Sequence, residues 1–161
     1  MKKILSLILA LMLLSFCACS NSEAASDPEP ATEEPAEIVV VDNETLTFKV
    51  TGVDNDNEWG YILEVFIENK TDMDLSVSWD QVVVNGYLCD PFWGMVIPAG
   101  AKANEEIIFY EGEGTDMDAN GLTPADVETI DFTLMVLEND NWEVDPIMQE
   151  QFSITPKTMC E

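Results

Sequence analysis

A short acidic segment has the spacing of a calcium-binding loop. Asp116, Asp118 and Asn120 stand at alternate positions and Gly121 follows them, as in loops whose alternate oxygen-bearing side chains bind calcium before a glycine bend. The twelfth position of such a loop carries a bidentate acid, but here it is Val127. We therefore expect a turn that leads into a short helix. Calcium binding by the first three residues is the alternative, and no other cofactor is expected.

Aromatic residues beside turn signals are the second group that could bind a ligand. Trp59 follows an Asp- and Asn-rich stretch, and Phe92 and Trp93 lie between two proline-containing turns. Exposed rings can stack on sugars or anchor a protein partner. We predict these three as a candidate ligand-binding set, with Tyr61 and Trp142 as further aromatics of interest. Core packing is the alternative for Trp59 and Trp93.

Two cysteines lie beyond the N-terminal region, Cys89 and Cys160. An extracellular location would permit a disulfide between them, and this bond would join the C-terminal tail to a strand. A buried thiol is the alternative for Cys89, because it alternates with Tyr87 in an apolar stretch. Both interpretations stay open from spacing alone.

The composition argues against catalysis. The chain has no histidine, so the commonest general base and any imidazole-activated nucleophile are missing. Paired carboxylates can hydrolyse glycosidic bonds, but chance pairs are frequent among 32 acidic residues. We predict no catalytic residues and no enzyme activity, and a carboxylate-pair glycoside hydrolase is the last alternative.

The N-terminus has the layout of a secretory signal. Two lysines precede an apolar run over residues 4–16, which is shorter than the ~20 residues of a membrane-spanning helix. Ala18 and Cys19 then resemble the lipobox of bacterial lipoproteins, in which a small residue precedes the cysteine that receives diacylglycerol. The resemblance implies a signal peptide over residues 1–18, lipidation of Cys19 and anchoring on the extracellular face of the cell membrane. An ordinary signal peptide cleaved near Ala24-Ala25 is the alternative.

A strongly acidic, proline-rich stretch follows at residues 19–37 and lacks apolar periodicity, so we predict a disordered linker. The whole chain has 32 acidic and 6 basic residues, a formal net charge of −26. This charge repels nucleic acid and anionic lipid headgroups, and it favours a basic protein, a cation-rich wall polymer or calcium.

Alternation of apolar and polar residues dominates residues 38–157 and predicts half-buried strands. The inward-facing positions that it predicts are Leu46, Phe48, Val50, Tyr61, Leu63, Val65, Ile67, Leu75, Val77, Trp79, Ile130, Phe132, Leu134 and Val136. Short connections exclude parallel crossovers. We therefore predict an all-β domain, an antiparallel β-sandwich of about seven or eight strands.

Turn signals divide these strands. We predict a turn over Val53–Asn57, a hairpin turn at Asn85-Gly86, an irregular connection from Pro91 to Gly100 and a strand over Trp142–Val144. One short helix is expected within Leu122–Thr129, because Thr123 can cap it and Pro124 suits its first position.

Several of these strand ends are similar to those of a group of Gram-positive lipoproteins of unknown function that carry immunoglobulin-like domains. The motifs are Phe48–Val53, Ile67–Thr71, Val84–Tyr87, Asp90–Trp93 and Pro98–Gly100. The resemblance spans about Leu46 to Thr155. It implies an immunoglobulin-like sandwich at the cell surface and transfers no catalytic residues. The expected function is a membrane-tethered, non-catalytic module that binds an extracellular protein or wall glycan.

Overall fold

The chain divides into two units, Met1–Thr32 and Glu33–Glu161. The computed structural model describes residues of the second unit only, namely 36–139, 141 and 143–159.

Several predictions fall outside the described residues. They are the signal peptide (1–18), lipidation of Cys19, nearly all of the linker (19–37), Trp142 and Cys160. Among the described residues, no helix is both long enough and apolar enough to cross a membrane.

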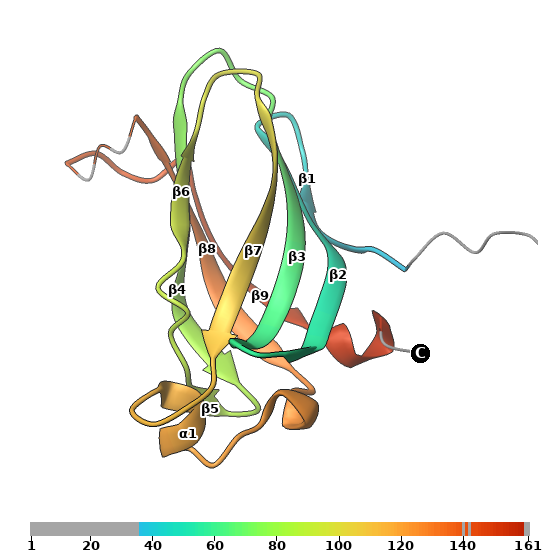
Figure 1. The fold of residues 1–161 in the computed structure, drawn as a ribbon. Helices are drawn as coiled ribbons and strands as arrows, with labels where there is room; N and C mark the ends of the chain where they lie inside the picture. Colours follow the sequence, from blue (N-terminus) through green and yellow to red (C-terminus); the bar gives the residue numbers. More distant parts are fainter. Residues whose placement is uncertain (1–35, 140, 142, 160–161) are drawn as a thin grey trace, which may run out of the picture. The chain divides into compact units, whose positions relative to one another are not determined.

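The described residues form nine β-strands in two antiparallel sheets (Figure 1). The strands are β1 (Ile38–Asp42), β2 (Leu46–Asn57), β3 (Gly60–Asn69), β4 (Leu75–Val84), β5 (Tyr87–Leu88), β6 (Gly94–Ile97), β7 (Lys102–Tyr110), β8 (Ile130–Glu138) and β9 (Met148–Ile154). The first sheet has the order β1-β2-β3-β7, and the second has the order β5-β4-β8-β9 with β6 also paired to β4. The prediction of an all-β architecture is confirmed, with nine strands in place of seven or eight.

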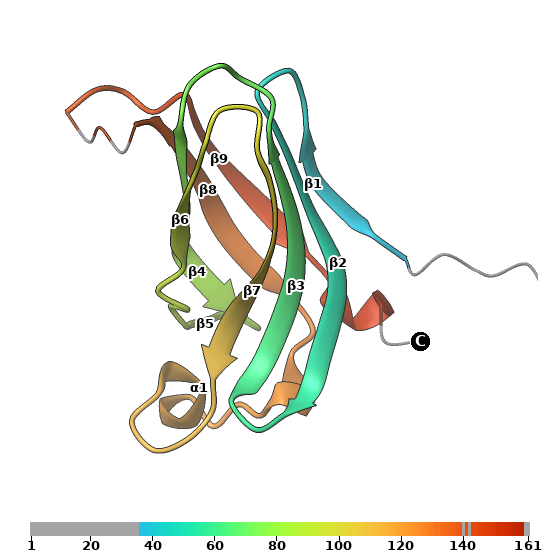
Figure 2. The same cartoon turned by 45° about the horizontal axis from the view of Figure 1, so that its top comes forward.

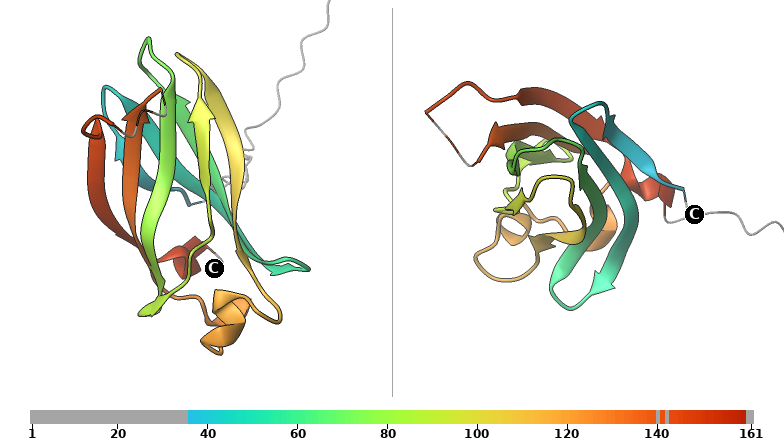
Figure 3. Two further views of the ribbon diagram at one scale, coloured as in Figure 1. Left: turned by 90° about the vertical axis from the view of Figure 1, so that its left-hand side faces the viewer. Right: turned by 90° about the horizontal axis from the view of Figure 1, so that it is seen from above.

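The two sheets face each other as layers (Figures 2 and 3), and the core lies between them. Every inward-facing position that alternation predicts belongs to this core. Trp79 on β4 stacks on Phe132 of β8 with ring centroids 3.8 Å apart and an interplanar angle of 13°. Phe48 of β2, which belongs to the first sheet, contacts Trp79 with ring centroids 6.0 Å apart. Such aromatic contacts add to the stabilisation from buried apolar area.

The predicted turn over Val53–Asn57 is wrong, because β2 continues through these residues. Pairing to β3 runs on to Asn57 opposite Gly60, with irregularities in register after Val50 and after Asp54. The local side-chain bonds typical of turns do form, since Asp54 accepts from the Asn57 side chain. The backbone pairing of β2 with β3 nevertheless outweighs the preference of these residues for a turn.

The predicted irregular connection between Pro91 and Gly100 is also partly wrong, because β6 lies inside it and pairs with β4. Gly94 permits that pairing, since an added Cβ would lie 3.1 Å from Cβ of Ser78. Glu143 and Val144 lie in a turn and a bend rather than in the strand predicted for Trp142–Val144.

The connections β1–β2, β3–β4, β6–β7 and β8–β9 meet at one end of the sheets, which we call the polar end. Asn69, 1% exposed, is its centre. Its side-chain amide donates to the carbonyls of Met73 (2.7 Å), Ile97 (3.1 Å) and Pro98 (3.1 Å), and its oxygen accepts from Thr71 N–H at 2.9 Å. One buried side chain therefore joins two connections through satisfied hydrogen bonds.

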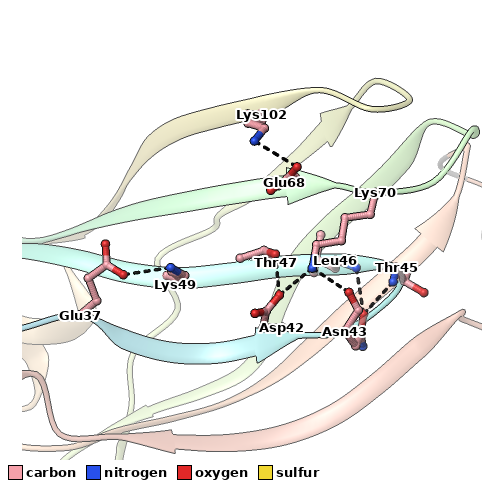
Figure 4. A network of polar contacts seen from close by, with 10 residues as sticks. All are labelled: Glu37, Asp42, Asn43, Thr45, Leu46, Thr47, Lys49, Glu68, Lys70 and Lys102. Atoms are coloured by element: carbon pink, nitrogen blue, oxygen red, sulfur yellow. Dashed lines mark hydrogen bonds and ion pairs between the residues drawn. The ribbon is translucent and has the colours of Figure 1, made fainter.

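Ion pairs extend the polar end onto the neighbouring strands (Figure 4). Lys70 Nζ lies 2.6 Å from Asp42 Oδ1 and also donates to the carbonyl of Asn43 at 2.8 Å. The hydrogen bond from Lys70 is the main cause that lowers the pKa of Asp42 below its ordinary value, and Thr47 adds a second bond. The β1–β2 and β3–β4 connections are therefore tied to each other.

Strand β7 ends the first sheet, and its free edge is polar. Asn104, Glu105 and Glu106 are exposed in succession. By register Glu105 stands on the strand face of the buried Ile107 and Phe109, yet its carboxylate is exposed to solvent. Charged residues placed in this way are a known protection of sheet edges.

Candidate functional site

The connections at the opposite end of the sheets carry exposed rings, and we call this end the aromatic end. It comprises the β2–β3 and β4–β5 turns, the β5–β6 segment and the β7–β8 connection (Figure 1). The exposed aromatic side chains of the described residues all belong to these connections or to the strand residues beside them: Trp59 (58% exposed), Tyr87 (50%), Phe92 (89%) and Tyr110 (49%). Exposed aromatic rings gathered at one end are typical of an interaction surface.

Trp59 is held in place by its backbone. Its N–H donates to the side chain of Asn57 at 3.1 Å, and its carbonyl accepts from Glu111 N–H at 3.0 Å. The second bond ties the β2–β3 turn to the end of β7, where Tyr110 pairs with Gly60. Of the two alternatives for Trp59, the structure shows exposure rather than core packing, and its backbone is bonded to a connection that is distant in sequence.

Phe92 is the most exposed large apolar residue of the described set. Its φ is +49°, in the left-handed region. A side chain with a Cβ is destabilised there by about 1–2 kcal/mol. The carboxylate of Asp90 stabilises the bend by accepting the Phe92 N–H at 2.7 Å. A strained backbone that presents an apolar ring to water is a feature found at functional sites.

Trp93 lies in a different environment from Phe92. It is half-buried and packs against the core. The centroid of its ring lies 5.9 Å from that of Phe48 and 6.1 Å from that of Trp79, and both ring pairs are arranged edge to face. Of the predicted ligand-binding set, Trp59 and Phe92 are exposed, and Trp93 follows the core-packing alternative.

A pocket of about 340 Å³ opens beside Phe92 at the aromatic end. Its walls come from the β5–β6 segment, the end of β7 and the start of the β7–β8 connection, and the lining residues are Cys89, Asp90, Phe92, Phe109, Tyr110, Gly114, Thr115, Asp116 and Met117. Its apolar and aromatic lining with a few polar groups is typical of ligand pockets. Two larger hollows lie on the outer faces of the sheets, and both are wide and open.

The calcium-loop pattern folds as a helix, α1 (Asp116–Ala119). Thr115 caps it by accepting the N–H of Asp118 at 3.3 Å. The expected turn is wrong for these four residues, because they form a helix, and the short helix into which the turn was to lead follows at Pro124–Asp126. Helical geometry does not direct alternate side chains to one point. Within the described residues, no three acidic, cysteine or histidine side chains gather as a metal site would require.

Two of the predicted calcium ligands instead attach α1 to the β5–β6 segment. Asp116 Oδ2 accepts from Asp90 N–H at 2.9 Å. The Asn120 amide donates to the carbonyl of Leu88 at 3.3 Å and lies 3.8 Å from the sulfur of Cys89. These contacts fix the two sides of the pocket relative to each other.

Cys89 is buried, and its thiol is free in the described structure. Burial is the main cause that raises its pKa, so the neutral thiol is favoured. Because Cys160 lies outside the described residues, the Cys89–Cys160 disulfide stays a prediction.

The β4–β5 turn completes the aromatic end. Asn85 and Gly86 both have positive φ, which confirms the predicted two-residue turn. The side chain of Asn85 accepts the N–H groups of Glu128 and Thr129 and donates to the carbonyl of Asp126 at 2.6 Å. The turn thereby anchors the β7–β8 connection.

The predicted short helix lies in the β7–β8 connection as a 3-10 helix, Pro124–Asp126. Asp126 accepts from the hydroxyl and the N–H of Thr123, at 2.7 and 2.9 Å. These two bonds lower the pKa of Asp126, and the bond from the Thr123 hydroxyl is the larger cause. The start at Thr123-Pro124 agrees with the sequence prediction.

Sequence reasoning missed Tyr110 and Tyr87 as surface residues. Tyr110 ends β7 and Tyr87 begins β5, so the local sequence presents both as strand residues. Their place at the ends of β7 and β5 is the signal that could have identified them, since strand ends border connections.

All four lysines of the described residues lie in ion pairs. The pairs are Lys49–Glu37 (3.0 Å), Lys70–Asp42 (2.6 Å), Lys102–Glu68 (3.1 Å) and Lys157–Glu128 (3.0 Å). No lysine lines the pocket beside Phe92, whereas Asp90 and Asp116 do. The electrostatic potential of the pocket is therefore set by carboxylates.

Comparisons of the chain with protein-family models, with curated proteins and with solved structures found no match.

Proposed function

We propose that the protein is a membrane-tethered, non-catalytic interaction module that binds an extracellular protein partner through its aromatic end. The observation that carries this proposal is the exposure of Trp59, Phe92 and Tyr110 around one end of the sheets, beside a pocket. Exposed aromatic anchors next to pockets dominate the energetics of protein interfaces. Strain at Phe92 supports the same conclusion, because the ring contributes little to the core.

We also propose that the domain is immunoglobulin-like. In such domains strands A, B and E share one sheet and strands C, F and G the other. The order β2-β3-β7 against β4-β8-β9 fits this arrangement. A buried tryptophan on strand C is a further hallmark, and Trp79 on β4 takes that place. In this assignment the aromatic end is opposite to the end that carries the antigen-binding loops of antibodies.

The tether is tested by replacing its anchor. Cys19→Ala should abolish incorporation of a labelled fatty acid into the chain, whereas Cys17→Ala should leave it unchanged. Stable anchoring by lipid requires acyl chains on the protein. Labelling of Cys19→Ala, or loss of labelling in Cys17→Ala alone, would overturn lipidation at Cys19.

Binding through the aromatic end is tested by capture of cell-surface proteins on the immobilised full chain. Trp59→Ala and Phe92→Ala should each reduce the captured partner, because exposed rings act as anchors. Val96→Ala is the matched control, since Val96 is an exposed apolar residue on β6 (51% exposed) that does not line the pocket. Equal capture by all variants contradicts the proposal.

A further inference from the structure

We propose that the pocket beside Phe92 binds a lysine or arginine side chain presented by a basic protein segment. This inference rests on the proposed function, and it specifies the chemistry of the partner. It follows from three properties of the pocket: its aromatic rim, its carboxylates and its size.

The aromatic rim suits a cation. Phe92 and Tyr110 line the pocket and are both exposed. An ammonium or guanidinium group over the face of such a ring is attracted to it, more strongly where water is excluded. The rest of the lining includes the buried Phe109, Met117 and Cys89. The aliphatic stem of lysine or arginine can pack on such apolar atoms while its charged group stays near water.

The carboxylates give the pocket its charge preference. Asp90 and Asp116 line it, and each accepts one backbone N–H, at 2.7 and 2.9 Å. A carboxylate has about four acceptor positions, so both can accept further hydrogen bonds. Bonds from a cationic donor are the strongest of these. Glu111, Glu113 and Asp118 are exposed in the adjoining connection and add charge of the same sign.

The charge of the whole chain favours a protein as the source of the cation. With a formal net charge of −26 for the whole chain and every described lysine paired, the protein attracts a partner in proportion to the partner's positive charge. In a segment with several basic residues, each positive charge adds to the electrostatic attraction. A small ammonium ion contributes only one such charge.

The size of the pocket agrees with this occupant. A volume of about 340 Å³ lies at the lower end of the range for small-molecule sites. It suits a single long side chain with the backbone of the segment outside. The exposed Trp59 and Tyr87 are then available to contact the remainder of the segment.

The test uses the full chain in detergent and a fluorescein-labelled peptide in which lysines alternate with glycine and serine. Fluorescence anisotropy at physiological ionic strength should show binding of this peptide. The same peptide with acetylated lysines should not bind, because acetylation removes the charge.

Two conservative variants separate the pocket from the general acidity. Phe92→Leu keeps apolar area and removes the ring face, and Asp90→Asn keeps the acceptor for the Phe92 N–H and removes the charge. Each should weaken peptide binding roughly three- to ten-fold. Asp72→Asn is the matched control, because Asp72 is exposed at the polar end, and it should change binding less than about two-fold.

If Asp72→Asn and Asp90→Asn weakened peptide binding equally, the inference would be overturned, since the peptide would then be attracted by the overall negative charge of the protein and not by the pocket. Unchanged binding by Phe92→Leu, or binding of choline by a chain that does not bind the peptide, would also overturn it. These outcomes are distinct from failure of the proposed function. Capture of a partner that depends on Phe92 but resists competition by the lysine peptide would leave the proposed function standing and remove this inference alone.

Discussion

The two ends of the sandwich are built from connections of opposite chemistry. At the polar end the buried side chain of Asn69 donates hydrogen bonds to carbonyls in and beside two connections. Lys70 joins the β3–β4 connection to the end of β1. At the aromatic end the backbone is also well bonded, through Asn85 and Asn120, but rings project into water. Hydrogen bonds thus join the connections at both ends, yet among the described residues the exposed aromatic rings lie at one end only. At the polar end these bonds hold connections together, whereas at the aromatic end they also hold the segments that carry the exposed rings.

The largest expected effect is at the polar end. Asn69→Ala should lower the free energy of unfolding by about 2–4 kcal/mol, because it removes the donor to one buried and two part-buried carbonyls. Urea denaturation of the variant measures this loss. Asn104→Ala, at an exposed position of β7, is the control and should change stability by less than about 0.5 kcal/mol. If both variants were equally stable, Asn69 would not be the centre of the polar end.

A smaller loss of stability is expected at the β4–β5 turn. Asn85→Ala should lower the free energy of unfolding by about 1–2 kcal/mol, through lost bonds to residues 126–129 and through positive φ. Asn85→Gly also loses the side-chain bonds but adopts the positive φ without strain, so it should be more stable than Asn85→Ala. Thermal unfolding of both variants separates the causes. The reverse order would show that turn conformation matters little.

At Phe92, stability and binding should change in different directions. Phe92→Gly should leave the free energy of unfolding unchanged or raise it by up to about 1 kcal/mol, because relief of strain offsets the added chain entropy. Partner capture should nevertheless fall. Leu88→Gly is the control, since Leu88 is exposed on β5 at ordinary φ, and it should destabilise by about 0.5–1 kcal/mol. A large loss of stability in Phe92→Gly would make the ring structural.

The smallest effect concerns acid. Since the pKa of Asp42 is lowered in the folded chain, its contribution to stability is present above the ordinary aspartate pKa and is lost as pH falls through the lowered value. Asp42→Asn should therefore show a slightly flatter decline in stability between about pH 5 and pH 2. Denaturation at several pH values measures this, and screening in salt should reduce it. Identical pH profiles for variant and parent would show that the Lys70–Asp42 pair does not contribute.

The core could be predicted from the sequence because period-two alternation reports directly which residues share a sheet face. Leu46, Phe48 and Val50 are an example, all 0% exposed. Strand β6 was missed because its four residues, Gly94–Ile97, begin with glycine and lie between prolines, which locally resemble a loop. Pairing with β4 supplies the stability that the local sequence lacks.

The pocket could be predicted only in part. Phe92 was identified from its neighbouring turn signals, whereas Asp90 and Asp116 were not related to it. They are 26 positions apart and meet through one hydrogen bond, so no local pattern links them. The calcium-loop pattern misled for the same reason, since contacts to Leu88 and Cys89 fix the role of Asn120.

The free edge of β7 has a consequence for how copies of the domain meet. An unpaired strand edge can add a strand from a second molecule, which is a common route to aggregation. On β7 such an addition would bring the exposed Glu105 and Glu106 against an equally acidic neighbour. Repulsion between like charges opposes that pairing. The β7 edge is therefore not suited to joining the sheets of two copies of the domain.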